Sequence, residues 1–263
     1  MELLSIIIDA SIEAGKEILK VYDTDFNIEY KEDESPLTLA DKRAHNIIVS
    51  YLEKTNIPVL SEEGRNISFE ERKQWEKLWV VDPLDGTKEF IKKNGEFTVN
   101  IALVENNEPV MGVVYAPVLD VLFVGDQQKG AFRIEQASKK EKIFDELKDT
   151  NKLPLTVNKD KDYYGVVASR SHLNRETEEF INKLKTNHKN IKIVSKGSSL
   201  KICMVAEGIA DIYPRFAPTM EWDTAAGDAV ARASGATVTN VKTNTPLVYN
   251  KEELLNPWFI VKR

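Results

Sequence analysis

A short apolar run that ends in closely spaced acidic residues is the feature of this sequence that most restricts its fold. The run, Leu-Trp-Val-Val at positions 78–81, is followed by Asp82, Pro83, Leu84, Asp85 and Gly86. This pattern predicts a buried strand that ends at Asp82, because Pro83 has no N–H with which to continue the ladder. Gly86 then permits a sharp turn.

A turn this tight would aim the carboxylates of Asp82 and Asp85 at one point and expose the Leu84 carbonyl between them. Two carboxylates about 4 Å apart repel by about 4 kcal/mol at an effective dielectric constant of roughly 20. A divalent cation would remove that repulsion. An isolated D-x-x-D is more often a solvated loop, but the buried strand, Pro83 and Gly86 together favour a metal site.

Two other acidic positions could join this site. Glu62 and Glu63 follow a second apolar run at 57–60, so they are expected at a neighbouring strand end, although an acidic pair by itself is usually a surface loop. Asp223 stands at the start of a predicted helix, where its alternative role is to cap the helix. The free amides of that helix start would also attract a phosphate group, and the two roles are compatible.

Composition limits the chemistry of any metal site. The chain has 263 residues with three histidines and one cysteine, so zinc and iron–sulfur constellations are excluded and a metal must be held by oxygen. Cys203 cannot form an internal disulfide, which fits a reducing compartment. The acidic start has no signal-peptide pattern, and no apolar run reaches the roughly 20 residues of a transmembrane helix. The net charge of −6 disfavours nucleic-acid binding.

The hydrophobic pattern predicts an α+β first half and an α/β second half, divided between residues 153 and 154. Residues 1–153 and 154–263 would form two domains, separated after a lysine-rich stretch that begins near Gln136. Helices are predicted at about 1–22, 40–54, 175–187, 199–207 and 224–233. Strands are predicted at about 78–82, 97–104, 110–115, 121–124, 130–134, 165–168 and 191–194.

The acidic segments resemble the defining motifs of the inositol monophosphatase superfamily. Residues 79–87 are similar to its W-x-x-D-P-[IL]-D-G-T motif, residues 222–227 to its W-D-x-A-A-G motif, and Ser61-Glu62-Glu63 to its acidic pair. The resemblance covers nearly the whole chain. It implies a layered αβαβα sandwich and a magnesium-dependent phosphomonoesterase.

The same resemblance implies the metal ligands and the groups that activate water. The implied magnesium ligands are Glu62, Asp82, the Leu84 carbonyl, Asp85 and Asp223. Thr87 and Asp41, together with Glu62, would assist the attack of water, although Asp41 could instead be only a helix-start residue. Two magnesium ions are expected, the family allows a third and weaker one, and lithium should inhibit. Such ions would lower the pKa of the attacking water and neutralise the leaving alkoxide.

Three further segments resemble the bisphosphate nucleotidase branch of the superfamily. They are D-G-T-K-E-F with N-G-E-F-T-V-N-I-A at 85–102, S-R-S-H at 169–172, and G-S-S-L-K at 197–201 with A-D-I-Y-P-R at 210–215. The implied substrate-binding residues are Gly86, Thr87, Ser169, His172, Ser198, Lys201, Arg215 and Asp223. As isolated residues, Lys201 and Arg215 would more often be solvated charges, and His172 a surface histidine.

The implied reaction is hydrolysis of the 3'-phosphate of adenosine 3',5'-bisphosphate to AMP and phosphate, with 3'-phosphoadenylyl sulfate as a second substrate. An inositol monophosphatase or a fructose-1,6-bisphosphatase is the nearest alternative, and a catalytically silent binding protein is another. We expect a cytoplasmic protein, with peripheral association with an inner membrane left open. The sequence leaves the choice between monomer and homodimer open.

Overall fold

The computed structural model describes residues 2–22, 28–30, 36–155, 161–168 and 173–263. Its largest sheet has six strands in the order β3-β4-β5-β6-β7-β8, and all neighbours are antiparallel except the parallel pair β3 and β4. These strands are β3 (Val59–Ser61), β4 (Lys77–Asp85), β5 (Thr98–Glu105), β6 (Glu108–Ala116), β7 (Val121–Asp126) and β8 (Gly130–Glu135).

A second sheet has five strands in the order β10-β9-β11-β13-β12. The first three of these strands are parallel, whereas β13 is antiparallel to both of its neighbours. The strands are β9 (Tyr164–Val167), β10 (Ile191–Val194), β11 (Ile212–Arg215), β12 (Thr237–Asn240) and β13 (Phe259–Lys262). A small antiparallel pair is formed by β1 (Ile28–Tyr30) and β2 (Pro36–Thr38).

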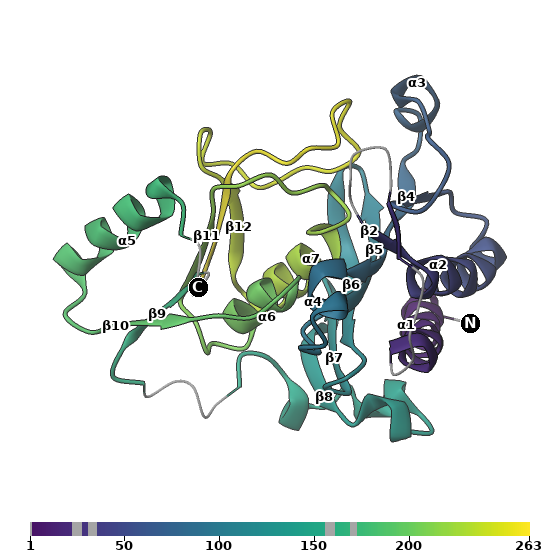
Figure 1. Ribbon diagram of the computed structural model, residues 1–263, viewed down its shortest axis with the longest axis horizontal. Coiled ribbons are helices and arrows are strands. Elements are labelled where there is room, and N and C mark those ends of the chain that lie inside the picture. The colour runs from purple at the N-terminus through teal and green to yellow at the C-terminus, as the bar shows by residue number, and fades with distance from the viewer. Residues whose placement is uncertain (1, 23–27, 31–35, 156–160, 169–172) are drawn as a thin grey trace.

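The helices lie in three layers around the two sheets (Figure 1). The outer layers are α1 (Leu3–Tyr22) with α2 (Leu39–Leu52) on the six-stranded sheet, and α5 (Arg175–Asn187) on the five-stranded sheet. Between the sheets lie α6 (Leu200–Ala206) and α7 (Ala225–Ala233). The predicted αβαβα sandwich is therefore confirmed.

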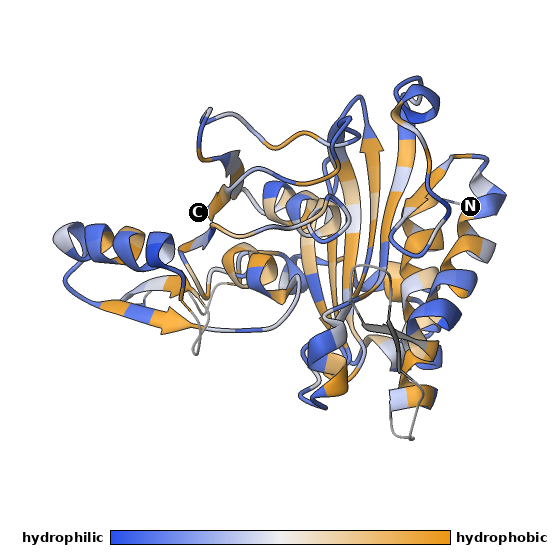
Figure 2. Ribbon diagram, turned by 45° about the horizontal axis from the view of Figure 1, so that its top comes forward, coloured by the Kyte–Doolittle hydropathy of each residue, from blue (hydrophilic) through white to orange (hydrophobic). Residues whose placement is uncertain are grey.

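Strand β4 shows why the six-stranded sheet is covered on both faces. Successive side chains of a strand point to opposite faces. Trp79 and Val81 accordingly pack in the cluster that contains α1 and α2, whereas Leu78 and Val80 pack in the cluster that contains α6 and α7. The sheet appears as a hydrophobic layer between helices in Figure 2. An unbroken apolar run is what a strand buried on both faces requires.

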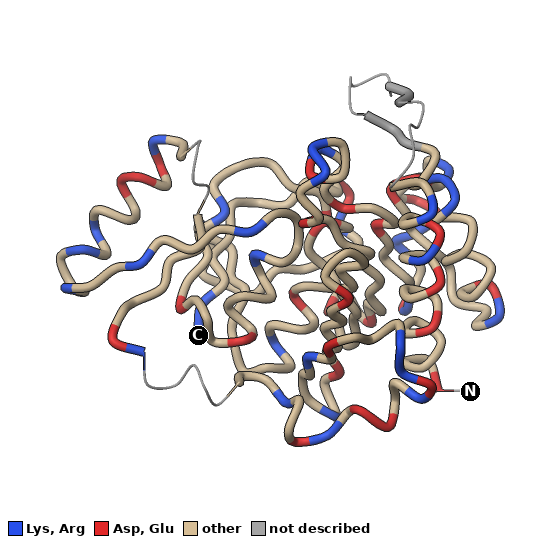
Figure 3. Tube along the Cα trace, turned by 60° about the horizontal axis from the view of Figure 1, so that its bottom comes forward, with Lys and Arg blue, Asp and Glu red and all other residues tan. Residues whose placement is uncertain are grey.

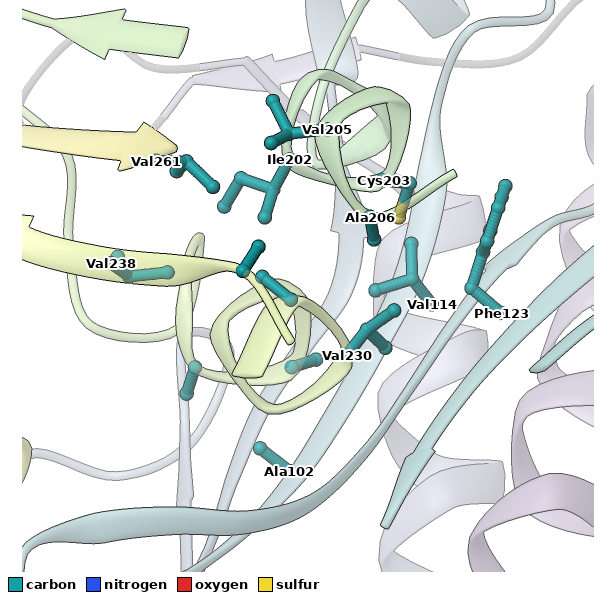
Figure 4. Packing of buried hydrophobic residues seen from close by; sticks show 14 of the residues in the cluster. Ala102, Val114, Phe123, Ile202, Cys203, Val205, Ala206, Val230, Val238 and Val261 are labelled. Carbon is teal, nitrogen blue, oxygen red and sulfur yellow. The ribbon is translucent and has the colours of Figure 1, made fainter. Parts of the chain in front are cut away.

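The central layer joins the two sheets into one core. Figure 4 shows Ile202 and Val205 of α6 and Val230 of α7 beside Val114 of β6 and Val261 of β13. Cys203 is buried in the same cluster and packs there as an apolar residue. Residues from both sides of position 153 contribute to this cluster, and the division into two domains there stays a prediction.

Two glycines let α7 approach the large sheet closely. A Cβ added to Gly112 of β6 would lie 2.8 Å from the Ala226 carbonyl oxygen, and one added to Gly125 of β7 would lie 2.5 Å from the Cα of Val230. Neither distance is possible for a real side chain. The close contact fixes the start of α7 against the sheet that carries Asp82.

The predicted helices and strands all occur, with ends that differ by a few residues. The largest difference is at the end of β4, which was predicted at Asp82 but lies at Asp85 after a shift of register against β5. The sequence pattern did not indicate β1, β2, β11, β12 and β13, the short helices α3 (Phe69–Arg72) and α4 (Thr87–Ile91), or the 3-10 turns η1 (Glu53–Thr55), η2 (Ala137–Lys139), η3 (Ile143–Glu146) and η4 (Asp149–Asn151).

Within the described ranges, no helix is long and apolar enough to span a membrane. Figure 3 shows basic and acidic positions interspersed along the helices and loops of the part that the structure describes. The exclusion of nucleic acid remains a prediction from the net charge.

Candidate metal and phosphate site

The parallel pairing of β3 with β4 places Glu62 beside Asp82. Ser61 is the register partner of Val81, and the Glu62 N–H donates to the Val81 carbonyl oxygen over 3.1 Å. Because β3 and β4 run parallel and in this register, Glu62 and Asp82 follow Ser61 and Val81 side by side, where β3 ends and β4 continues to Asp85. The predicted position of Glu62 at a neighbouring strand end is confirmed.

The strand β4 continues past Asp82 to Asp85 with a shift of register against β5, and the chain turns at Gly86. The Leu84 N–H donates to Asp82 Oδ1 over 3.1 Å, and α4 begins at Thr87 directly after Gly86. Gly86 has φ +93°, and a Cβ there would lie 3.2 Å from the Cβ of Ser198. Both the left-handed backbone and the close approach require glycine. The sharp turn thus lies at Gly86, after Asp85, because β4 continues through Asp85 instead of ending at Asp82. The charge of Asp85 still contributes to the raised pKa of Asp82, and the convergence of the two carboxylates on one metal stays a prediction.

Asp223 lies two residues before α7 but does not cap it. The residue at the N-cap position is Thr224, and Asp223 Oδ2 instead accepts the Met220 N–H over 2.8 Å. The capping role considered for Asp223 is therefore wrong. The neighbouring Glu221 is fully buried and accepts backbone N–H groups from Asn250 and Lys251, which fixes the loop that carries Asp223.

Three carboxylates from distant parts of the chain meet in one place. Glu62, Asp82 and Asp223 each offer an oxygen atom, and these three atoms all lie within 4.8 Å of one another. Asp82 is buried. Its pKa is raised well above the ordinary value, first by burial and then by the charges of Glu62, Asp85, Asp223 and Asp41. The pKa of Asp223 is raised to about 7, by burial and by the charge of Asp85.

These residues have the chemistry of a site for a divalent cation. Oxygen ligands suit magnesium, calcium and manganese. Burial, and then the charges of neighbouring carboxylates, raise the pKa values of Asp82 and Asp223, and a bound cation would offset that repulsion. Asp85 is oriented by the Ser199 N–H, which donates to its Oδ2 over 2.6 Å. The described residues thus fit the predicted metal site. That the Leu84 carbonyl oxygen is one of the metal ligands stays a prediction.

Asp41 and Thr87 lie on separate helices at the same side of the sheet. Asp41 is in the first turn of α2, so it does lie at a helix start, as the alternative interpretation assumed. Its charge also contributes to the raised pKa of Asp82. Thr87 is the first residue of α4 and follows Gly86. That the two residues cooperate in activating water stays a prediction.

A pocket extends from the carboxylates toward two cationic side chains. Asp85, Ser198, Lys201, Arg215 and Asp223 all line it. Lys201 Nζ donates to the Ser198 carbonyl oxygen over 3.2 Å, and Arg215 donates to the Pro218 carbonyl oxygen over 3.0 Å.

A second hollow shares Lys201 and Arg215 with this pocket and continues along Pro214 and Phe216. The two hollows therefore run from the carboxylates past both cations. Ser169 and His172 fall outside the described residues, so their predicted contacts with substrate stay predictions.

Sequence reasoning missed two residues of this site. Ser199 contacts Asp85 and Asp223, and Asn100 contacts Asp85 and Ser199. Both lie inside segments that were recognised only as motifs of the nucleotidase branch. The motifs therefore included both residues, but they did not indicate which carboxylates Ser199 and Asn100 contact.

The choice of Glu62 over Glu63 as a metal ligand leads to a prediction. Glu62 offers an oxygen to the three-carboxylate cluster, and Glu63 does not. We expect Glu62→Gln to weaken magnesium binding about tenfold or more, which is a loss of about 1.4 kcal/mol or more. Glu63→Gln is the matched control and should bind magnesium as the wild type does. Calorimetric titration with magnesium would check this, and equal affinities for the two variants would contradict the assignment.

Comparison with known proteins supports what the geometry indicates. The 3'(2'),5'-bisphosphate nucleotidase CysQ of Salmonella typhimurium is 47% identical over 252 residues, and the protein of the same name from Escherichia coli K12 is 46% identical over 253 residues. In each case the alignment covers 94% of this chain and 94% of the relative.

Solved structures agree with the sequence comparison. The crystal structure of CysQ from Bacteroides thetaiotaomicron is 51% identical, has a TM-score of 0.89, and is matched over 98% of this chain and 96% of its own. An inositol monophosphatase of Thermotoga maritima shares the fold at 22% identity with a TM-score of 0.73, over 100% of this chain and 92% of its own. The model of the inositol monophosphatase family matches residues 1–258. On this match and these identities, the chain belongs to the inositol monophosphatase family.

Proposed function

We propose that this protein is a magnesium-dependent phosphatase that removes the 3'-phosphate of adenosine 3',5'-bisphosphate and releases AMP and phosphate. The observation that carries the proposal is the meeting of Glu62, Asp82 and Asp223 beside a pocket that also contains Lys201 and Arg215. The names of the relatives at 46–47% identity support the same substrate class. The proposal includes 3'-phosphoadenylyl sulfate as a second substrate and a cytoplasmic location.

The metal ligands in this proposal are Glu62, Asp82, the Leu84 carbonyl, Asp85 and Asp223. They would hold two magnesium ions, with a third bound more weakly, and lithium would compete. When bound, magnesium lowers the pKa of a coordinated water and offsets the charge that develops on the leaving oxygen. The carboxylates supply a fixed negative site that attracts the ions and orients them toward the scissile phosphate.

The remaining residues have roles in proton handling and substrate binding. Thr87 Oγ1 would accept a hydrogen bond from the attacking water and donate its own proton to the Asp41 carboxylate. This arrangement would favour direct attack by water, because no cysteine, histidine or serine lies in a nucleophile motif of the sequence. Backbone amides at Gly86 and Thr87 and those after Asp223 would bind phosphate oxygens.

The second phosphate of the substrate needs cations other than the metal ions. Lys201 and Arg215 line both hollows, so a phosphate placed between the hollows would be within reach of both side chains. Ser198 lies in the same pocket and adds a hydroxyl donor. Charge-assisted hydrogen bonds of this kind are among the strongest that proteins make. An inositol monophosphate would leave these cations without an anionic partner.

The function is tested by measuring phosphate release from adenosine 3',5'-bisphosphate, inositol 1-phosphate and fructose 1,6-bisphosphate in parallel. We expect the highest kcat/KM for the nucleotide. Equal or faster turnover of inositol phosphate would assign the chain to the nearest alternative. Absence of turnover of all three substrates, at saturating magnesium, would favour a silent binding protein.

The role of Arg215 gives a second test of the substrate. We expect Arg215→Gln to raise KM for adenosine 3',5'-bisphosphate roughly tenfold, because a hydrogen bond to a charged group is worth about 1.5–3 kcal/mol. The KM for adenosine 3'-monophosphate, which lacks the second phosphate, should change much less. Arg175→Gln on α5 is a control, since Arg175 is exposed and pairs with Glu179. Equal changes for both substrates would remove Arg215 from the second phosphate site.

A further inference from the structure

The segment before α6 is held by Thr98 and Asn100 at the start of β5 and by Glu96, which precedes the strand. Glu96 Oε2 accepts the Gly197 N–H over 2.8 Å, the hydroxyls of Thr98 and Ser198 are 3.1 Å apart, and Asn100 Nδ2 donates to Ser199 Oγ over 3.0 Å. Alternate residues of a strand share one face. Thr98 and Asn100 therefore point to the same face and form hydrogen bonds with Ser198 and Ser199, and Glu96 continues the series by binding Gly197.

Ser199 ends this series and touches two of the proposed metal ligands. Its N–H donates to Asp85 Oδ2 over 2.6 Å, and its hydroxyl donates to the Asp223 carbonyl oxygen over 2.7 Å. Only 3% of its surface is exposed. Asp85 lies at the end of β4, whereas Asp223 belongs to the loop before α7. Ser199 thus links two ligands that are far apart in the sequence.

The direction of each hydrogen bond around Ser199 is determined by its partners. A backbone carbonyl can only accept, so the Ser199 hydroxyl proton points to Asp223. The Ser199 oxygen then accepts from the Asn100 amide, whose Nδ2 also faces Asp85 Oδ2 at 3.4 Å. A carboxylate likewise accepts only, which orients the Asn100 amide. The network has one consistent arrangement of protons.

We propose that Ser199 is a positioning residue, which holds Asp223 at the correct distance from Asp85 for metal binding, with Asn100 orienting its hydroxyl. The inference rests on the proposed function only in that these carboxylates are taken to hold magnesium. The buried Ser199 donates through its hydroxyl to the Asp223 carbonyl oxygen and through its N–H to Asp85, so it connects the Asp223 loop directly to the end of β4. Groups that orient metal ligands change metal affinity when they are removed, although they do not touch the metal.

Ser199→Ala removes the tether to Asp223 and keeps the N–H that binds Asp85. We expect its affinity for magnesium, measured by calorimetric titration of the protein without substrate, to fall about 10–100-fold. The kcat at low magnesium should fall with it and recover in part at high magnesium, while KM for the nucleotide changes little. Ser199→Thr keeps a hydroxyl and should restore most of the affinity.

Ser11→Ala is the matched control. Ser11 is also a buried serine whose hydroxyl donates to a backbone carbonyl, that of Ile8, over 2.8 Å, but it lies in α1. The magnesium affinity of the Ser11→Ala variant should equal that of the wild type. A folded Ser199→Ala variant that binds magnesium within twofold of the wild type would overturn the proposal, as would an equal loss in Ser11→Ala.

If Ser199→Ala does not fold, Asn100→Ala gives the same test. The magnesium affinity of Asn100→Ala should also fall, but by a smaller factor than that of Ser199→Ala. In this variant the Ser199 hydroxyl remains but is no longer oriented by the Asn100 amide. Unchanged affinity in a folded Asn100→Ala variant would then overturn the proposal. A wild-type protein that binds magnesium but hydrolyses no nucleotide would reject the proposed function, and the titrations would still decide the role of Ser199.

Discussion

Asp82→Asn is expected to abolish phosphatase activity and to make the metal-free protein more stable. Asp82 is 1% exposed, and its pKa is raised first by this burial and then by the charges of four other carboxylates. Removing its charge relieves this repulsion, and the new amide can donate to the neighbouring carboxylates. The same change removes a ligand from the metal site. A loss of about 4 kcal/mol of transition-state stabilisation, the size of one carboxylate–cation interaction near a protein surface, would lower kcat/KM by about 10³-fold.

The two effects of Asp82→Asn are separated by two measurements. Thermal unfolding without metal should show a higher Tm, since each 1 kcal/mol raises the Tm of a domain this large by roughly 2–4 °C. Phosphate release at saturating magnesium should show the loss of activity.

Asp126→Asn is the control for both measurements. Asp126 is also a buried aspartate that accepts backbone N–H groups, but it lies at the end of β7. It should keep full activity and gain no stability. A destabilised but active Asp82→Asn variant would contradict the placement of Asp82 in a repelling metal site.

The stability of the metal-free protein is expected to fall as the pH rises from about 4 to about 7. The pKa of Asp223 is raised from 3.8 to about 7 in the folded protein, so in this window the folded state binds more protons than the unfolded state. Stability decreases with pH wherever that is so. The stabilising contribution is therefore fully present below pH 3.8 and is lost as the pH passes about 7. A shift of about three units corresponds to at most about 4 kcal/mol.

Magnesium should reverse this loss, because a cation and protons compete for the same carboxylates. The rise in Tm on adding magnesium is expected to be small near pH 5 and to grow toward pH 8. Asp223→Asn isolates the contribution of this group, since other titrating residues are unchanged in it. The Tm of that variant, measured without metal, should depend less on pH than the Tm of the wild type. Identical pH profiles for the two proteins would refute the raised pKa of Asp223.

Much of the secondary structure was predictable because it depends on local pattern. The α1, α2 and α5 helices have apolar residues at helical spacing, and β4 is an apolar run between polar turns. The strands β11, β12 and β13 were not predicted. Each has only four residues, and β11 contains Pro214. Such short segments become strands through the neighbours they pair with rather than through their own pattern.

The sequence by itself determined which acidic residues could bind a metal, because an apolar run directly before Asp82 and Gly86 directly after Asp85 restrict the chain locally. It indicated that Asp223 could join Glu62 and Asp82, but it could not determine that Asp223 leaves its helix uncapped or that Ser199 links Asp223 to Asp85. The pairing of Ser199 with Asp85 joins residues 114 positions apart, and Asp223 is farther still from Glu62 and Asp82 in the sequence. These contacts exist because glycines in β6 and β7 let α7 pack against the sheet, which is a property of the assembled layers and not of any one segment.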